Sequence, residues 1–383
     1  MSKSPLRVGL IGFGFIGKVH AHCYQSIPFC ISQPKIQAQV CAVLRSSLGK
    51  DAEILRSLGN PLETTSLEEF FSQGLDLVDI CSPNWLHFSQ IQAALEKGLN
   101  ISCEKPLALN LVEARSCVRA AEKAGVLTHT SFTMRYTPAV QQAKAILAAG
   151  ALGEIYNFRI HYFHNSYMDP ARPISWRLQK AVSGGGALAD LGIHMIDMAN
   201  YLLGEASWVS CRTRTFITER PATAGNAQMT PVDVDDWALC LLGMKNQAEG
   251  SIEVTRMSGG LGDSCRIEIF GSKGSVEIDF SHTSSARYYD QGRKQFHLGS
   301  LDFPIPAGER PLQEVLPSPK ASLGWFKDAH LGSIYDFLLD IEEQKQSPAS
   351  FAAALKAQEI LEAAYLSAGR NSEKVFLPLP EEA

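Results

Sequence analysis

Residues 8–17 read Val-Gly-Leu-Ile-Gly-Phe-Gly-Phe-Ile-Gly and contain three glycines with the spacing G-x-G-x-x-G. The spacing alone is weak evidence, because glycine is common in loops. Here it follows a predicted strand over residues 6–11 and opens a predicted helix over residues 17–26, which is the context that a dinucleotide-binding turn requires. The stretch therefore predicts a Rossmann domain. The alternatives are a glycine-rich turn without a ligand and an S-adenosylmethionine-binding methyltransferase with a similar loop.

Each residue of this loop has its own expected task. Gly12 allows the tight turn, Gly14 lets a pyrophosphate approach the backbone, and Gly17 lets the helix pack closely on the strand. Phe15 and Ile16 lie at the helix start, where free N–H groups and the positive end of the helix dipole attract phosphate oxygens. These five residues form the predicted phosphate-binding part of a cofactor site.

The first third of the sequence alternates strand-like apolar runs with helical patterns. Further strands are expected at residues 39–44, 77–81, 100–103 and 126–132. Two of the intervening helices end at a glycine, Gly98 and Gly125, which is a common helix stop. Such alternation predicts an α/β fold, a doubly wound parallel sheet with helices on both faces.

The pattern changes after Pro138, where strand-like runs follow one another with few helices between them. They span residues 154–164, 208–217, 237–244, 250–256, 265–270 and 275–280, with a hairpin turn expected at residues 271–274. A loop rich in proline and glycine and two helices, near residues 330–344 and 350–367, follow. We expect a Rossmann dinucleotide-binding domain over residues 1–133, and a second α/β domain over residues 134–383 with a large, mostly antiparallel open sheet.

The composition excludes several classes of function. The 383 residues carry a formal net charge of −5 without a basic block, which argues against a nucleic-acid partner. No stretch is apolar over the roughly 18 residues that a membrane-spanning helix needs. The nine cysteines lack the C-x-x-C spacing of zinc and redox motifs and lie partly in apolar runs. They indicate small buried side chains in a reducing compartment, the cytoplasm.

The end of the second predicted strand indicates which dinucleotide binds. NAD-binding domains usually carry a carboxylate there for the ribose 2′-hydroxyl. This sequence has Arg45, Ser46 and Ser47 instead. A guanidinium and hydroxyls suit a 2′-phosphate, so the residues predict NADP, with NAD as the alternative. If Arg45 does not bind a 2′-phosphate, the alternative is that it is an exposed side chain without any contact.

Lys105 is the first candidate for chemistry. It lies in Cys103-Glu104-Lys105-Pro106, at the end of a predicted strand, and ligands of open α/β sheets bind beyond the carboxyl ends of the strands. Its amine would therefore lie near a nicotinamide, hydrogen-bond a substrate hydroxyl and relay protons. The alternative is an ordinary surface lysine.

Asp190 and His194 form the second candidate pair. They follow a glycine run at residues 184–186 and lie four residues apart, so they share one face of a predicted helix. Oxidation of an alcohol needs a base for the hydroxyl proton, and histidine suits this task near neutral pH. The alternative is a core histidine on an otherwise apolar helix. No metal site is predicted, because strand alternation separates His161, His164 and Asp169 onto different faces.

Taken in order, these motifs resemble the Gfo/Idh/MocA family of glucose–fructose oxidoreductases and inositol dehydrogenases. The shared motifs are the glycine loop, Ser-Pro-Asn-Trp-Leu-His at residues 82–87, Glu-Lys-Pro at 104–106, Trp-Arg at 176–177, and G-G-G-x-L-x-D-x-G-x-H at 184–194. Their order and approximate spacing match over nearly the whole sequence. The set is far more specific than any one motif.

The resemblance implies a nicotinamide-dependent oxidoreductase in which Lys105, Asp190 and His194 form the catalytic group. His194 would be the general base, Lys105 would hold the reacting hydroxyl, and Asp190 would orient the substrate or the imidazole. The residues implied to line the cofactor are Ser82, Pro83, Asn84, His87, Glu104 and Lys105, with Trp176 and Arg177 reaching over the nicotinamide region. The second domain would bind a small carbohydrate substrate and form a homodimer or homotetramer.

Further stretches, at residues 169–170, 173–180, 194–199 and 231–236, resemble the sugar 3-dehydrogenases of this family. They imply oxidation of a secondary hydroxyl of a sugar, anhydrosugar or inositol, with C3 as the expected position. His164 and Asn165 are expected to face the substrate. They differ from the polar residues that face the sugar in the similar 3-dehydrogenases, so the identity of the substrate is left open. Two other functions also stay open: a redox-assisted glycoside hydrolase with a tightly bound nicotinamide, and a non-catalytic nicotinamide-binding regulator.

Overall fold

The computed structural model describes residues 4–225, 227–299 and 303–381. The chain divides into two compact units. Unit 1 comprises Met1–Ala108, Glu113–Tyr136 and Gly308–Leu355, and unit 2 comprises Leu109–Val112, Thr137–Ala307 and Lys356–Ala383. Each unit is described by itself below.

Unit 1 is built on a six-stranded parallel sheet in the order β3-β2-β1-β4-β5-β6. The strands are β1 (Leu6–Ile11), β2 (Ala38–Leu44), β3 (Leu62–Thr64), β4 (Leu77–Ile80), β5 (Asn100–Cys103) and β6 (Thr128–Thr130). The predicted doubly wound parallel sheet is thus confirmed, with the short β3 as an unpredicted addition. The strand order reverses between β1 and β4, and ligands of such sheets bind at this switch point.

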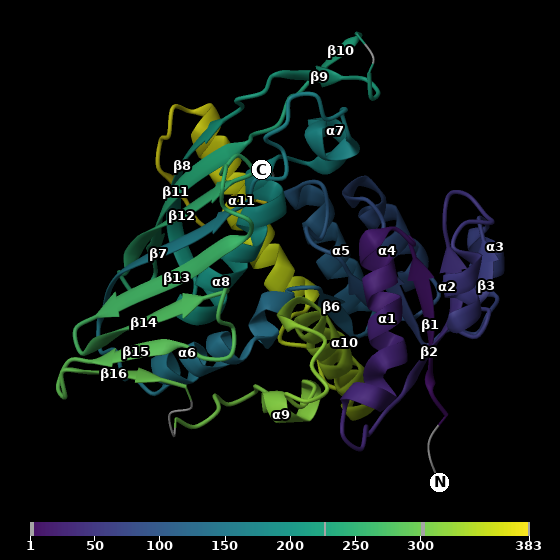
Figure 1. Ribbon diagram of the computed structural model, residues 1–383, viewed down its shortest axis with the longest axis horizontal. Coiled ribbons are helices and arrows are strands. Elements are labelled where there is room, and N and C mark those ends of the chain that lie inside the picture. The colour runs from purple at the N-terminus through teal and green to yellow at the C-terminus, as the bar shows by residue number, and fades with distance from the viewer. Residues whose placement is uncertain (1–3, 226, 300–302, 382–383) are drawn as a thin grey trace. The chain divides into compact units, whose positions relative to one another are not determined.

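The helices of unit 1 come from two widely separated parts of the sequence. Those of the first third are α1 (Phe15–Cys30), α2 (Ala52–Ser57), α3 (Leu67–Phe71), α4 (His87–Leu95) and α5 (Leu111–Ala124), with short turns of 3₁₀ helix at η1 (Asn84–Leu86) and η2 (Thr133–Tyr136). The later ones are α9 (Leu312–Val315) and α10 (Trp325–Glu343), while α11 (Phe351–Gly369) runs from unit 1 into unit 2. Figure 1 shows α10 beside α1.

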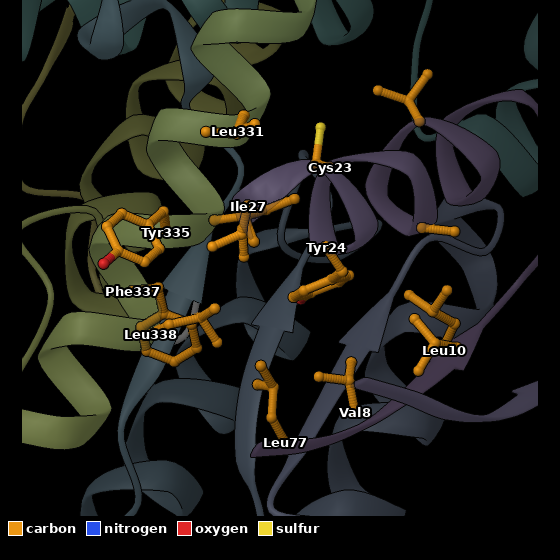
Figure 2. Packing of buried hydrophobic residues seen from close by; sticks show 14 of the residues in the cluster. Val8, Leu10, Cys23, Tyr24, Ile27, Leu77, Leu331, Tyr335, Phe337 and Leu338 are labelled. Atoms are coloured by element: carbon orange, nitrogen blue, oxygen red, sulfur yellow. The ribbon is translucent and has the colours of Figure 1, made fainter. Parts of the chain in front are cut away.

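The core of unit 1 explains why α10 belongs to it. Figure 2 shows Ile27 of α1 facing Leu331 and Tyr335 of α10, and all three are at most 1% exposed. Every residue of α10 from Ala329 to Ile341 is buried, which is typical of a helix in the interior of a core. The division therefore differs from the expected boundary at residues 133 and 134, because residues 308–355 belong to unit 1, where α10 packs against α1.

Unit 2 is built on a nine-stranded sheet in the order β16-β15-β14-β13-β7-β12-β11-β8-β17. Its strands are β7 (Ile155–Phe163), β8 (Ala206–Arg214), β11 (Trp237–Met244), β12 (Glu249–Thr255), β13 (Ser264–Gly271), β14 (Gly274–Asp279), β15 (Arg287–Asp290), β16 (Gln295–Leu298) and β17 (Val375–Phe376). Only the pairing of β7 with β12 is parallel, so the predicted mostly antiparallel sheet is confirmed. The expected hairpin turn joins β13 to β14.

The remaining elements of unit 2 lie around this sheet. They are α6 (Pro138–Ala148), η3 (Trp176–Leu178), α7 (Lys180–Ser183), the π-helical segment η4 (Leu188–Gly192), α8 (Ile193–Leu203), and a separate hairpin of β9 (Glu219–Pro221) and β10 (Met229–Pro231). Helices α6 and α8 pack against the sheet (Figure 1). The nine cysteines are free thiols, and all except Cys41 are buried. Within the described ranges, no helix is both long and apolar enough to cross a lipid bilayer.

Candidate active site

The glycine loop joins β1 to α1, and the structural reason for having glycine differs among its three positions. Gly12 has a φ of +91°, and a Cβ there would lie 2.7 Å from the backbone nitrogen of Ser82. A Cβ on Gly17 would lie 2.2 Å from the carbonyl oxygen of Gly12. The fold itself therefore requires glycine at both positions, as the loop motif predicts.

Gly14 differs, because the fold gives no steric reason for it. A Cβ there would meet nothing within 4 Å, and the backbone has an ordinary φ of −77°. Gly14 is the N-cap of the 16-residue helix α1, where no side chain caps the helix and the first turn contains no acidic residue. The helix start therefore offers uncapped N–H groups beside open space, which fits the pyrophosphate of a dinucleotide.

Arg45 is neither exposed nor without partners. Its side chain is 11% exposed, and its guanidinium donates to Asp51 and to Glu63, each at 3.2 Å. Asp51 also accepts a hydrogen bond from Lys18 at 2.7 Å. The alternative of an Arg45 that touches nothing is therefore wrong. The two carboxylates also offset the positive charge that a 2′-phosphate would need.

The loops after β4 and β5 are tied together by His87. Its ring is fully buried, with Nε2 2.9 Å from the carbonyl oxygen of Ser82 and Nδ1 2.9 Å from that of Pro106. The hydroxyl of Ser82 donates to Gln90 on α4 at 2.6 Å. His87 is therefore a buried side chain that connects the two loops expected to line the cofactor, and it does not lie at the surface of the site. Pro83 and Asn84 lie partly exposed on the first of these loops.

Glu104 and Lys105 follow β5 at the carboxyl edge of the parallel sheet. The Oε2 of Glu104 accepts the backbone N–H of Lys105 at 3.2 Å, and its Oε1 lies 3.3 Å from the Nε2 of His20. Burial by itself raises the pKa of Glu104, but the close contact with His20 and the charge of that imidazole lower it to about 2. Lys105 therefore directly follows an ionised, buried carboxylate.

The sequence analysis missed two residues of this neighbourhood. Asp79 is fully buried in β4, and its carboxylate is 2.8 Å from the Nδ1 of His20, which is fully buried on α1. A signal was present in each case. Asp79 interrupts the apolar run of β4, while His20 and Tyr24 stand four residues apart among the buried residues of α1. Charged or polar residues at core positions mark networks or sites.

In unit 2, the glycine run positions the segment that carries Asp190. A Cβ on Gly186 would lie 1.9 Å from the carbonyl oxygen of Asp235. The carboxylate of Asp235 accepts the backbone N–H groups of Gly186 and Leu188 at 2.9 and 2.8 Å, which fastens the start of η4. The π-helical geometry of η4 is rare and occurs frequently at functional sites.

Asp190 is held by a buried arginine that the sequence analysis did not single out. The Nη2 of Arg256 donates to Asp190 at 3.0 Å, and the side chains are 1% and 29% exposed. The guanidinium also lies over the ring of Tyr167, at 4.8 Å from its centroid. His194 follows on α8 and is partly exposed, whereas its neighbours Ile193 and Met195 are buried.

His164 lies in the same unit, directly after β7. Burial lowers its pKa and the Asp190 carboxylate opposes this shift, so the two groups share one electrostatic environment. The next residue, Asn165, is exposed. In η3, the guanidinium of Arg177 stacks on the ring of Trp176 at 4.3 Å. Unit 2 thus contains Asp190, His194, His164 and the Trp176–Arg177 pair, whereas Lys105 and the glycine loop belong to unit 1.

Among the described residues, the close groups of three ligand-type side chains are His20–Glu104–His330 and His20–Asp79–Cys81, and all are buried. The histidines and aspartate first considered, His161, His164 and Asp169, are not among them.

Comparison with known proteins agrees with this geometry. Residues 6–132 match a model described as "Oxidoreductase family, NAD-binding Rossmann fold", and residues 140–277 match the "GFO/IDH/MocA C-terminal domain". Levoglucosan dehydrogenase of Pseudarthrobacter phenanthrenivorans is 34% identical over 96% of this chain and 97% of its own length. Glucose-6-phosphate 3-dehydrogenase of Bacillus subtilis is 25% identical over 93% and 94%.

Solved structures extend the likeness to the whole fold. Levoglucosan dehydrogenase in complex with NADH and L-sorbose has a TM-score of 0.89 and 32% identity, covering 98% of this chain and 100% of that one. Its complex with NADH and levoglucosan has a TM-score of 0.88 with the same identity and coverage. The chain described here therefore belongs to the Gfo/Idh/MocA family of oxidoreductases.

Proposed function

We propose that this protein is a nicotinamide-dependent dehydrogenase that oxidises or reduces a secondary hydroxyl position of a sugar, anhydrosugar or inositol. The observation that carries the proposal is the pairing, in unit 1, of an open phosphate cradle at Gly14 with Lys105 at the carboxyl edge of the same sheet. The named relatives include dehydrogenases of levoglucosan, glucose 6-phosphate and myo-inositol, which supports a carbohydrate substrate.

Each side chain has a defined task in this proposal. The nicotinamide, when bound, accepts or supplies the hydride. Lys105 holds the reacting hydroxyl and assists transfer of its proton, His194 takes that proton as general base, and Asp190, oriented by Arg256, binds the substrate or the imidazole.

The remaining candidate residues surround these groups in the proposal. Ser82, Pro83 and Asn84 line the cofactor, supported from below by His87 and Glu104. In unit 2, His164, Asn165 and the stacked Trp176–Arg177 pair face the substrate and the nicotinamide region. Two relatives are named 3-dehydrogenases, of glucose 6-phosphate and of D-glucosides, which supports C3 as the reacting position.

For the cofactor, we propose NAD(H), with NADP as the alternative. The residue type of Arg45 alone favours NADP, but its ion pairs with Asp51 and Glu63 leave little positive charge for a 2′-phosphate. The family model describes an NAD-binding fold, and the similar solved structures contain NADH. Binding of NADP would require Arg45 to exchange a carboxylate for the phosphate, with both carboxylates left nearby.

We also propose a homodimer or homotetramer. Exposed apolar side chains on the nine-stranded sheet support it, among them Tyr156, Leu241, Phe296 and Leu298. Light scattering after size exclusion should give a mass of two or four chains, and a monomer at micromolar concentration would contradict this.

The test is reduction of NAD and NADP, in parallel, over a panel of sugars, anhydrosugars and inositols. We expect turnover with one substrate class and a higher kcat/KM with NAD. Lys105→Ala should lower kcat by about 10²-fold or more, the usual contribution of a positioned acid–base group. Lys123→Ala, at an exposed position on α5, is the matched control and should keep full activity. Full turnover by Lys105→Ala would refute the catalytic assignment, whereas silence over the panel with nicotinamide retained would favour the redox-assisted hydrolase.

A further inference from the structure

A buried group of ionisable side chains lies behind Lys105 in unit 1, and the proposed reaction does not use it directly. It consists of Asp79 on β4, His20 on α1 and Glu104 at the end of β5, and is named the His20 cluster below. The side chains of Asp79 and His20 are 0% and 1% exposed, and that of Glu104 is 11% exposed. Burying two carboxylates is costly unless each has a charged partner.

Both nitrogens of His20 face a carboxylate. Nδ1 lies 2.8 Å from the Oδ2 of Asp79, which also accepts the hydroxyl of Tyr24 at 3.0 Å. Nε2 lies 3.3 Å from the Oε1 of Glu104, an ion-pair distance, and within the described structure neither of these two buried atoms has a hydrogen-bond partner. The imidazole therefore spans two carboxylates from separate strands.

The charges within the His20 cluster agree with this geometry. Burial lowers the pKa of His20, but the charge of Asp79 more than reverses this and holds it well above its ordinary value. Burial raises the pKa of the Cys81 thiol to about 12, and burial followed by the charge of His20 lowers that of His330 to about 4. The cluster thus contains one imidazolium between two carboxylates, beside a neutral thiol and a neutral imidazole.

Glu104 connects the His20 cluster to Lys105. While Oε1 faces His20, Oε2 accepts the backbone N–H of Lys105 at 3.2 Å. His20 also lies on α1, the helix whose N-terminus is the phosphate cradle. One imidazole therefore joins the helix of the cofactor loop to the peptide that carries the proposed catalytic lysine.

We propose that His20 is a positioning residue for the reaction: clamped by Asp79, it holds Glu104 so that the peptide at Lys105 keeps the orientation that catalysis requires. The inference rests on the proposed role of Lys105. Displacement of a reacting group by about 1 Å can cost 10²-fold in rate, so loss of the clamp should lower kcat while leaving cofactor affinity nearly unchanged.

Two substitutions separate the two contacts of His20. His20→Asn places an amide near the position of Nδ1, so it can still meet Asp79 but does not reach Glu104. His20→Gln carries an amide N–H out to about the position of Nε2 and can donate to Glu104. The matched control is His129→Asn, which removes another fully buried histidine of unit 1, one bonded to Ser102 and Ser333 at 3.1 and 2.9 Å.

The experiment measures kcat, the Kd for NADH and residue-resolved hydrogen exchange in the full-length protein. We expect His20→Asn to lower kcat by about 10–100-fold with a Kd within about threefold of the unsubstituted protein, and His20→Gln to recover a large part of the loss. The Lys105 amide should exchange faster in His20→Asn than in His20→Gln or His129→Asn. His129→Asn should lower the thermal midpoint with little change in kcat.

Several outcomes would overturn the inference. Equal losses of kcat in His20→Asn and His129→Asn, or no recovery by His20→Gln, would make His20 an ordinary core residue. One equivalent of zinc in the purified protein, lost with His20→Asn, would replace the proton-held clamp with a metal site at His20, Glu104 and His330. If Lys105→Ala keeps full turnover, the proposed function fails. If Lys105→Ala is inactive and His20→Asn keeps its activity, only this inference fails. Hydrogen exchange at the Lys105 amide tests the support by His20 even when no substrate is known.

Discussion

Single buried side chains in this protein derive their properties from partners distant in sequence. His20 and Asp79 are 59 residues apart, and Arg256 and Asp190 are 66 apart. In each case a charge that would be unfavourable in an apolar interior is compensated by a contact of 2.8–3.0 Å. Removing one partner therefore lowers the stability of the fold by more than the interaction itself contributes, because the other charge stays buried without compensation.

Arg256 provides a test of this asymmetry. Arg256→Met should lower the free energy of unfolding by somewhat less than the ~3–5 kcal/mol typical of a broken buried pair, because Asp190 is 29% exposed and can be hydrated. Activity should fall as well, since Asp190 loses its orientation. Denaturant unfolding and kcat of Arg256→Met, Asp190→Asn and the double variant measure both effects. Additive losses of stability would mean that the two side chains do not interact.

His129 predicts a pH dependence of stability. Burial lowers its pKa to about 3, whereas an unfolded histidine titrates near 6.5. Below about pH 6.5 the unfolded state binds a proton that the folded state does not, so this group costs stability as the pH falls, by at most ~1.4 kcal/mol per pH unit. The thermal midpoint of His129→Asn should therefore decline less steeply between pH 6.5 and 4.5 than that of the unsubstituted protein. Parallel curves would contradict the assignment.

At the scale of elements, the turn from β1 into α1 separates demands of the fold from demands of a ligand. Gly12 and Gly17 are required because a Cβ would clash with backbone. Gly14 faces open space at an uncapped helix start. The same motif thus contains two glycines that the fold requires and one, Gly14, for which the fold gives no steric reason.

Substitution by alanine distinguishes these two kinds of glycine. Gly14→Ala should leave the thermal midpoint unchanged or slightly raised, because alanine adopts this backbone conformation without strain. It should nevertheless raise the Kd for NADH, because the Cβ occupies the cradle. Gly17→Ala should lower the thermal midpoint, since its Cβ would lie 2.2 Å from the carbonyl oxygen of Gly12. Unchanged NADH affinity in Gly14→Ala would remove the pyrophosphate from this position.

At the scale of the whole molecule, unit 1 is assembled from segments that lie far apart in the sequence. Residues 308–355 supply α9 and α10, and the buried face of α1 packs against α10. Without this segment, side chains such as Tyr24 and Ile27 would lose part of their apolar surroundings (Figure 2). The dinucleotide-binding sheet is therefore continuous in sequence, but its complete core is not.

This assembly predicts the behaviour of fragments. Residues 1–136 alone should be poorly folded, because the surface that α10 covers is exposed to water. A fragment that joins residues 1–136 to residues 308–355 through a flexible linker should fold cooperatively and bind NADH. Circular dichroism, the dispersion of amide resonances and NADH titration test both fragments. Cooperative unfolding of residues 1–136 alone would show that α10 is dispensable.

Features that depend on residues close together in the sequence could be predicted, whereas features that depend on contacts between distant residues could not. The parallel and the mostly antiparallel sheets were predicted, because apolar periodicity and turn residues act over a few positions. The three-residue strand β3 was missed, since so short a strand has no detectable periodicity. Lys105 could be placed at a strand end, but its support by His20 required knowledge of which strands and helices are neighbours.

The sequence by itself determined the glycine turn, the alternation of strands and helices, and the family resemblance, because these reside in local spacing. Tertiary structure decided what the charged residues do. Arg45 looked ready for a 2′-phosphate until folding placed Asp51 and Glu63 against it. Likewise, α10 became part of unit 1 only through packing on α1. The physical reason is that charge pairing and burial depend on distances in space, and these distances follow from the complete fold.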